Sequence, residues 1–273
     1  MNSSPPDPLH GGTLHPLNRD FVWRAPAWAP SFLSREDFAQ YCAEGYVLVR
    51  GAVSRDEVAA VTAAIDPFEA EAEAFLRTRP DGRFLIAQAD AITFTTHVAA
   101  RSDVLRAFAG SAPFTGLVRD LIGPCVRLYW DQAVYKKPEN PKEFPWHQDN
   151  GYTFVEPQEY LTCWVALTDT DETNGCPWVV PGLHRHGTLK HWWTETGYRC
   201  LEAPEGAVAV PARAGDIVVF SSLTPHRTGP NTSGAVRKAY ILQYAPDGAV
   251  AIAEDGTRTL QNDAARQFMV TDV

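Results

Sequence analysis

The sequence lacks the features that would mark a membrane or secreted protein. No apolar run approaches membrane-spanning length, and the first residues hold neither the basic nor the apolar part of a secretory signal. We therefore expect a cytoplasmic protein with no membrane partner. The five cysteines are odd in number and widely spaced, with no Cys-x-x-Cys pair, which argues against a disulfide framework and a structural zinc site.

A basic surface is also missing. The net charge of −9 and the pI of about 5.4 argue against nucleic acid or an anionic bilayer as the main partner. They do not exclude a small anionic ligand, because the charge inside a pocket can oppose the net charge. We expect a small-molecule partner.

What is present is an ordinary globular composition, with 45% hydrophobic and 21% charged residues in a chain of 273. Six prolines and a Gly-Gly pair in about the first thirty residues predict an extended arm over residues 1–32. No internal repeat or interdomain linker follows. Residues 33–273 are therefore predicted to form a single domain.

The first part of this domain is predicted to be a helical layer, over about residues 33–123. "LSREDFAQYCAEGY" begins at a capping Ser34, and "SRDEVAAVTAAIDPF" carries a capping box formed by Ser54 and Glu57. Pro67 should end that second helix, and a new one should begin within "FEAEAEAFLRT". "YVLVRG" between the two helices is a short predicted strand.

A β core is predicted over about residues 124–246. In "VRLYWDQAVYKK" the even positions, including Gln132, share one mostly apolar face. Gln132 is either a buried amide bonded to backbone or a ligand contact, and periodicity does not decide between them. Further short apolar runs separated by turn clusters predict a mainly β sandwich or barrel beneath the helical layer.

The stretch "WHQDNGYT" raises the question of a metal site. His147 and Asp149 are two residues apart, so on a strand they would point the same way. His226, just after the strand-like "DIVVF", is the best third ligand. Two histidines and one carboxylate on one face leave open positions, as in non-haem iron(II) oxygenases. A second histidine group lies in "HRHGTLKH", where flanking cations and the absence of a carboxylate favour a solvated loop rim.

Arg237 lies eleven residues after His226, in the strand-like "VRKAYILQY". Alternation places it on one face with Ala239, Ile241 and Gln243. An arginine among small and apolar neighbours needs an anionic partner, which is either a structural Asp or Glu or the carboxylate of a ligand.

Taken together, these motifs resemble the phytanoyl-CoA dioxygenase-like branch of the iron(II)/2-oxoglutarate oxygenases. The resemblance rests on "EGYVLVRGAVSRDEV", "FPWHQDNGY", "WVALTDTDETNGCPWVVPGLHRHG" and "GDIVVFSSLTPHRTGPNTSGAVRKAY", and covers about residues 33–246. It implies a double-stranded β-helix, a jelly-roll barrel whose mouth holds the metal. It also implies a dioxygenase that uses Fe(II), 2-oxoglutarate and O2.

The resemblance assigns roles to individual residues. His147, Asp149 and His226 would be the iron ligands, and Arg237 with the hydroxyl of Thr228 would bind the distal carboxylate of 2-oxoglutarate. Gln132 and Trp164 match positions that line the cosubstrate in relatives. Halogenating relatives carry Gly or Ala in place of the carboxylate ligand, so Asp149 favours hydroxylation or another oxidation over halogenation.

Substrate residues follow less directly. Trp146, Tyr152 and Phe154 flank the metal motif and are either pocket walls or ordinary aromatic core. Lys136 is a candidate for the pocket; with Lys137, Arg185 and Lys190 it either lines an anion-binding mouth or belongs to the solvated surface.

Two other functions compete with the oxygenase. A non-redox barrel, either a metal-dependent isomerase or a ligand-binding protein, could keep the triad but would not need Arg237. A zinc hydrolase could use the same ligands, but a helical His-Glu-x-x-His motif and a separate general base are not evident.

Overall fold

The computed structural model describes residues 7–271, which form a jelly roll of two facing antiparallel sheets. The large sheet runs β1–β13–β8–β15–β5–β4–β3–β2, with β18 also paired to β5. Its strands are β1 (Tyr46–Val49), β2 (Arg83–Phe84), β3 (Ala87–Gln88), β4 (Ile92–Thr96), β5 (Val126–Lys136), β8 (Leu161–Ala166), β13 (Ile217–Ser221), β15 (Arg237–Pro246) and β18 (Met269–Thr271).

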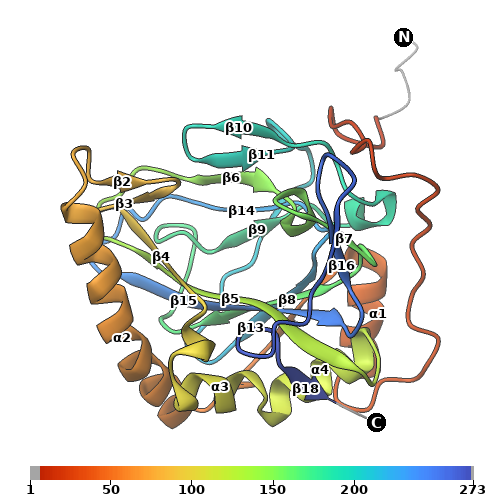
Figure 1. Ribbon diagram of the computed structural model, residues 1–273, viewed down its shortest axis with the longest axis horizontal. Helices are drawn as coiled ribbons and strands as arrows, with labels where there is room; N and C mark the ends of the chain where they lie inside the picture. The colour runs from red at the N-terminus through yellow and green to blue at the C-terminus, as the bar shows by residue number, and fades with distance from the viewer. Residues whose placement is uncertain (1–6, 272–273) are drawn as a thin grey trace.

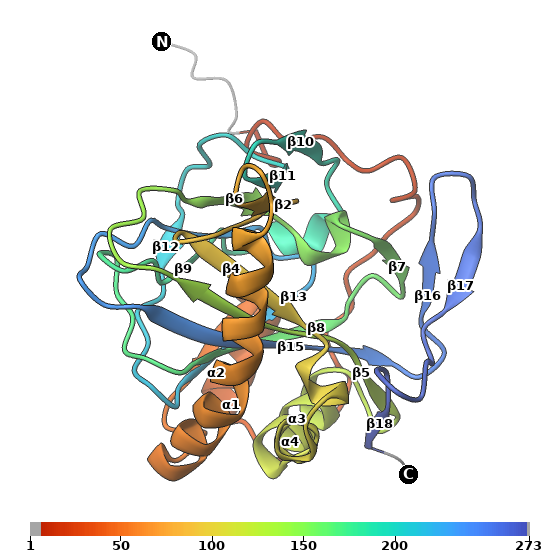
Figure 2. The ribbon, with the colours of Figure 1, turned by 60° about the vertical axis from the view of Figure 1, so that its left-hand side comes forward.

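The small sheet lies across the inner face of the large one (Figure 1). Its order is β12–β9–β14–β6, with bounds β12 (Val208–Ala209), β9 (Pro177–Val179), β14 (His226–Thr228) and β6 (Phe144–His147). Two hairpin-like additions flank the barrel. They are β10 (Trp192–Thr194) with β11 (Gly197–Arg199), and β7 (Phe154–Glu156) with β16 (Val250–Ile252) and β17 (Arg258–Leu260), the latter projecting from one side in Figure 2.

Helices cover the outer face of the large sheet. They are α1 (Arg35–Glu44), α2 (Arg55–Arg77), α3 (Asp103–Ala109) and α4 (Ala112–Leu121). The chain also forms three short 3₁₀ turns, η1 (Val98–Ala100), η2 (Asp149–Gly151) and η3 (Leu183–His186). Ile65 of α2 and Phe114 of α4 are fully buried in one apolar cluster with Cys163 and Val219 of the sheet. No helix within residues 7–271 is long and apolar enough to span a bilayer.

The predicted caps are confirmed, but the predicted break at Pro67 is wrong. Ser34 accepts a hydrogen bond from the Asp37 amide, and Ser54 forms the expected capping box with Glu57. Helix α2 continues through Pro67 to Arg77. Pro67 and the residue four positions earlier, Ala63, are both exposed, so water can bond to the carbonyl that the proline leaves without a donor.

A bulge in β5 corrects the predicted alternation of that strand. The register with β15 slips at Tyr129, because Gln243 pairs with Trp130 and Tyr244 with Leu128. Val126 and Leu128 therefore pack in the cluster under the helices. Beyond the bulge, Gln132 and Val134 face the barrel interior, where they lie opposite Ile241 and Ala239. The predicted single face is thus split in two.

The arm, from residue 7 onward, lies against the barrel; its first six residues fall outside the described part. Leu14 makes an antiparallel bridge to Leu189, His15 N–H donates to the carbonyl of Thr188 at 2.9 Å, and Lys190 N–H donates to Thr13. The arm thus adds a strand-like edge to the segment Gly187–His191, which matters for the site below.

Candidate metal and cosubstrate site

Three side chains converge where the two sheets meet. His147 ends β6, His226 begins β14, and the two are paired across these strands with ring centroids 4.1 Å apart. The Nε2 atoms of both rings lie 3.9 Å from Oδ1 of Asp149. Ligand atoms of all three residues lie within 4.8 Å of one another, a spacing that suits one metal ion.

Asp149 reaches this position differently from the prediction. It does not lie on the strand beside His147, but begins the 3₁₀ turn η2 that follows it. The turn, rather than strand alternation, aims the carboxylate at the two imidazoles.

The histidine tautomers suit metal binding. The Nδ1 atom of His147 lies 2.8 Å from the carbonyl oxygen of Pro145, and that of His226 lies 3.0 Å from the carbonyl oxygen of Thr224. A carbonyl only accepts, so each Nδ1 carries the proton and each Nε2 keeps its lone pair. Burial lowers the pKa of His226 to about 4 and that of His147 well below its ordinary value. Both rings are therefore neutral at pH 7.

Asp149 has a supporting pair that the sequence did not reveal. Thr162 Oγ1 donates to Asp149 Oδ2 at 2.5 Å, and Gln243 Nε2 lies 3.4 Å from the same hydroxyl. Burial raises the pKa of Asp149, while His147, Thr162 and Gln243 lower it. The hydroxyl engages Oδ2 and leaves Oδ1 facing the imidazoles. Alternation predicted that Gln243 shares a strand face with Arg237, but it did not predict that Gln243 meets Thr162.

Arg237 is a buried cation without an anion. It is 1% exposed, and its Nη1 makes a long 3.4 Å bond to the carbonyl of Val134. Its Nε and Nη2 have no hydrogen-bond partner anywhere in residues 7–271. Burial lowers its pKa to about 10, so it stays charged at neutral pH. The sequence predicted that its anionic partner is either a structural Asp or Glu or the carboxylate of a ligand. No Asp or Glu among the described residues pairs with it, so the carboxylate of a ligand is the alternative that fits.

The other predicted cosubstrate residues lie around the same interior. Trp164 is buried, with the guanidinium of Arg237 5.4 Å from its ring centroid. Gln132 and Trp164 both pair with Ile241, so they share the inner face with Arg237. Thr228 ends β14, two residues after His226.

Lys136 does not lie at an open mouth. It is fully buried beside Arg237, and its Nζ donates to the carbonyls of Thr228 and Gly229. Burial and Arg237 hold its pKa well below its usual range. The amine joins β5 to the end of β14, and its full burial keeps it away from an open mouth. The predicted substrate role therefore does not fit this position. Lys137 is engaged too, by Glu69.

The aromatic residues that flank the motif divide into two groups. Tyr152 stays near the metal ligands, with its ring 5.4 Å from that of His147. Trp146 packs in a separate core cluster with Leu183 and Leu201. Phe154 is buried under the arm, where it stacks on His15 at 4.9 Å. Of the three, Tyr152 fits the predicted pocket, and the other two fit the alternative of aromatic core.

The predicted histidine rim is only partly a rim. His186, Arg185 and Lys190 are exposed, but His184 is fully buried. His191 lies against the segment that carries the metal ligands. Its Nε2 accepts a hydrogen bond of 2.9 Å from the amide of Gln148, the residue between His147 and Asp149. The contact is invisible in the sequence because forty-three residues separate its partners.

Gly151 makes room for the His191 ring, which leads to a test. A Cβ on Gly151 would lie well under 3.0 Å from that ring, while the backbone φ is one that any residue adopts. We expect Gly151→Ala to lower the free energy of unfolding by about 1–3 kcal/mol, as overpacking does. Urea unfolding measures this. The double variant with His191→Ala should be less destabilised than the sum of the two single changes.

Gly234→Ala is the matched control, because nothing lies within 4 Å of its added Cβ. Strict additivity of Gly151→Ala and His191→Ala would show that the ring is not the obstacle.

Acid should destabilise the metal-free protein through its buried histidines. Burial lowers the pKa of His184, His191 and His226 to about 4, whereas an unfolded imidazole titrates near 6.5. The unfolded chain thus binds more protons between these values, so stability should fall as pH drops from 6.5 towards 4. Burial raises the pKa of Asp131 and Asp149, which works in the opposite direction.

Urea unfolding of EDTA-treated protein at pH 7 and pH 5 measures the difference. His184→Phe should flatten the dependence, because one depressed histidine is removed. Equal stability at the two pH values would contradict the expectation.

Comparison with known proteins agrees with this geometry. The sequence profile of the family described as phytanoyl-CoA dioxygenase (PhyH) matches residues 41–239. The phytanoyl-CoA dioxygenase of Arabidopsis thaliana is 25% identical over 154 residues, 54% of this chain and 54% of that protein. The peroxisomal phytanoyl-CoA dioxygenase of Rattus norvegicus is 24% identical over 262 residues, 87% of this chain and 75% of that protein.

A solved structure shares the fold. The alpha ketoglutarate dependent carbocyclase SnoK from nogalamycin biosynthesis superposes with a TM-score of 0.68 at 24% identity, over 82% of this chain and 90% of that chain. The chain spans about half the length of the first curated relatives it matches.

Proposed function

The chain belongs to the phytanoyl-CoA dioxygenase (PhyH) family, and from this premise we propose that it is a non-haem Fe(II)- and 2-oxoglutarate-dependent dioxygenase of a small molecule. One observation carries the proposal. Two buried, neutral imidazoles and a carboxylate that is 13% exposed share the barrel interior with a buried guanidinium. Two nitrogens of this guanidinium have no partner within the described chain. This donor set fits a divalent metal together with a dianionic cosubstrate.

The proposed roles follow from these positions. His147, Asp149 and His226 would hold Fe(II), and Arg237 with Thr228 would bind the distal carboxylate of 2-oxoglutarate. Gln132 and Trp164 would line the cosubstrate. When bound, Fe(II), 2-oxoglutarate and O2 supply an oxidant for an unactivated C–H bond, and 2-oxoglutarate is converted to succinate and CO2.

The protein itself orients the ligands and excludes water. The carbonyls of Pro145 and Thr224 fix the two imidazole tautomers, and Thr162 fixes the rotation of the Asp149 carboxylate. The inner apolar cluster, which includes Trp164, keeps bulk water from the oxidising centre. Because Asp149 supplies a carboxylate, we propose hydroxylation or a related oxidation rather than halogenation.

The test is succinate formation from 2-oxoglutarate by the Fe(II)-loaded protein in air, with product-mass screening of a metabolite mixture for a gain of one oxygen. We expect slow succinate formation alone and faster formation with a substrate. Absence of both succinate and 2-oxoglutarate binding would sink the proposal. It would then favour a non-redox isomerase, a ligand-binding barrel or a zinc hydrolase.

A further inference from the structure

Two cations, from β2 and from the segment before β6, converge on one exposed carboxylate in the β10–β11 turn. Arg83 of β2 donates from Nη1 to Glu195 Oε1 at 3.0 Å and from Nη2 to the Glu195 carbonyl at 2.8 Å. Lys142, just before β6, lies 3.6 Å from the same Oε1 and donates to Gln88 at 2.8 Å. Glu195 belongs to the turn between β10 and β11, so three separate elements meet here.

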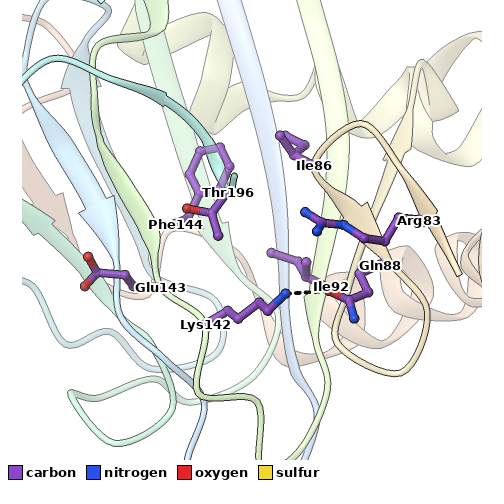
Figure 3. Close-up of a pocket in the computed structure, with 8 residues that line it drawn as sticks. All are labelled: Arg83, Ile86, Gln88, Ile92, Lys142, Glu143, Phe144 and Thr196. Carbon is purple, nitrogen blue, oxygen red and sulfur yellow. Dashed lines mark hydrogen bonds between the residues drawn. The ribbon is translucent and has the colours of Figure 1, made fainter. Parts of the chain in front are cut away.

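A small cavity lies between these elements (Figure 3). Its lining combines the two cations, apolar side chains and a few polar groups: Arg83, Ile86, Gln88, Ile92, Lys142, Glu143, Phe144 and Thr196. In Figure 3 the Arg83 and Lys142 head groups point into the same space from opposite walls. The free volume is about 20 Å³, which holds no more than a water molecule. Glu195 is not among the lining residues, but its carboxylate contacts both cationic head groups that reach the cavity.

The cavity adjoins the metal site through Phe144. The Phe144 ring lies edge-on to His147 with centroids 4.7 Å apart, and it stacks on Tyr152 at 6.4 Å. Tyr152 contacts Tyr198, which contacts the exposed Trp193, so aromatic rings continue from the metal ligand to the surface. Phe144 therefore belongs both to the cavity lining and to the ring series that begins at the metal ligand.

Glu195 is well placed to yield to a competing anion. Its side chain is 72% exposed, and its contacts with Arg83 and Lys142 are solvent-accessible ion pairs, which contribute little to stability. Glu143 is not an equivalent partner for the pair, because it is engaged by Arg227 and lies near Arg199. Without Glu195 the cavity would present two cations facing an apolar wall, and such a surface favours an anion on an apolar body.

We propose that Arg83 and Lys142 form a subsite for an anionic group, a carboxylate or a phosphate, on a ring-containing or otherwise apolar substrate. Glu195 pairs with both cations in the free protein and releases them when the substrate binds. The inference rests on the proposed function, because it names the substrate class of that same site. Arg83 and Lys142 take the place of the cations that the sequence suggested for an anion-binding mouth. Of those cations, Lys136 bonds backbone carbonyls and Lys137 pairs with Glu69.

The experiment measures binding without turnover. Protein is titrated with 2-naphthoate, 2-naphthyl phosphate and neutral 2-naphthamide, and tryptophan fluorescence is followed. Titrations are run on metal-free protein and on protein loaded with Mn(II) and the 2-oxoglutarate analogue N-oxalylglycine, which the proposed function expects to bind Arg237. We expect Glu195→Gln to increase the affinity for at least one of the two anions at least threefold and to leave the affinity for 2-naphthamide unchanged. Arg83→Gln and Lys142→Gln should each weaken the same anion at least threefold.

Glu202→Gln is the matched control, since Glu202 is a 70% exposed carboxylate that pairs with Arg199 near the same hairpin. It should change none of the affinities. The anion that responds more strongly identifies the group.

Two failures are distinguishable. If neither anion binds, or if Glu195→Gln tightens neither, the subsite is overturned even when Mn(II) and N-oxalylglycine bind. If Mn(II) and N-oxalylglycine do not bind, the proposed function fails, and the metal-free titrations still decide the subsite.

Discussion

Replacing Arg237 by methionine should weaken 2-oxoglutarate binding strongly and at the same time stabilise the free protein. The guanidinium is buried with two nitrogens that lack partners in the described chain, so it destabilises the unliganded fold. An apolar side chain of similar length should raise the free energy of unfolding by about 1–3 kcal/mol. Loss of the cation from a buried ion pair with the cosubstrate should cost about 2–5 kcal/mol of binding, roughly 30-fold or more.

Calorimetric titration with 2-oxoglutarate and urea unfolding measure the two effects. Lys238→Met is the control, because Lys238 is the next residue of β15 but points to the opposite face, where it pairs with Asp66. It should leave 2-oxoglutarate binding intact. An Arg237→Met variant that binds 2-oxoglutarate normally would remove Arg237 from the site.

Asp149→Ala should have the largest effect on metal affinity. The substitution removes the one anionic ligand of the three. Metal affinity should therefore fall by more than the roughly 10–100-fold that follows loss of a residue that only supports a ligand. Thr162→Val, which removes only the hydroxyl that bonds Asp149 Oδ2, should fall within that lower range. Metal titration monitored by Mn(II) electron paramagnetic resonance gives both affinities.

Asp131→Asn separates metal binding from general loss of a buried carboxylate. Asp131 lies on the opposite face of the large sheet, where it accepts from the Ala99 amide and the Tyr240 hydroxyl. This variant should be less stable yet bind metal normally. If Asp131→Asn and Asp149→Ala lost metal equally, the ligand role of Asp149 would be unsupported.

His147, Asp149 and Arg237 could be named as candidates from sequence because each belongs to a local pattern. His147 and Asp149 lie within three residues, and the alternation of β15 puts Arg237 on the interior face. The supporting contacts of Thr162, Gln243 and His191 were not found, because they join segments far apart in the chain. Spacing carries no information about such contacts.

The errors at Pro67 and in β5 have a different origin. A helix can contain proline where water bonds to the carbonyl that loses its N–H donor, here that of Ala63. Whether Pro67 is exposed depends on tertiary packing, which the local sequence does not reveal. The bulge at Tyr129 inserts one residue into β5 without any turn signal in the sequence. Both required knowledge of what the segment packs against.

The arm carries a consequence for the metal centre. Residues 13–15 bond the segment Gly187–His191, and that segment bonds Gln148 within the metal turn. We expect docking of the arm to tighten metal binding through these contacts. Thermodynamic linkage then requires that metal binding tightens docking of the arm by the same factor. Hydrogen exchange should therefore slow at the His15 and Lys190 amides when metal is added, although neither residue is one of the proposed ligands. Proteolytic removal of the arm would therefore lower the affinity for the metal, although the cleavage site is distant from the ligands.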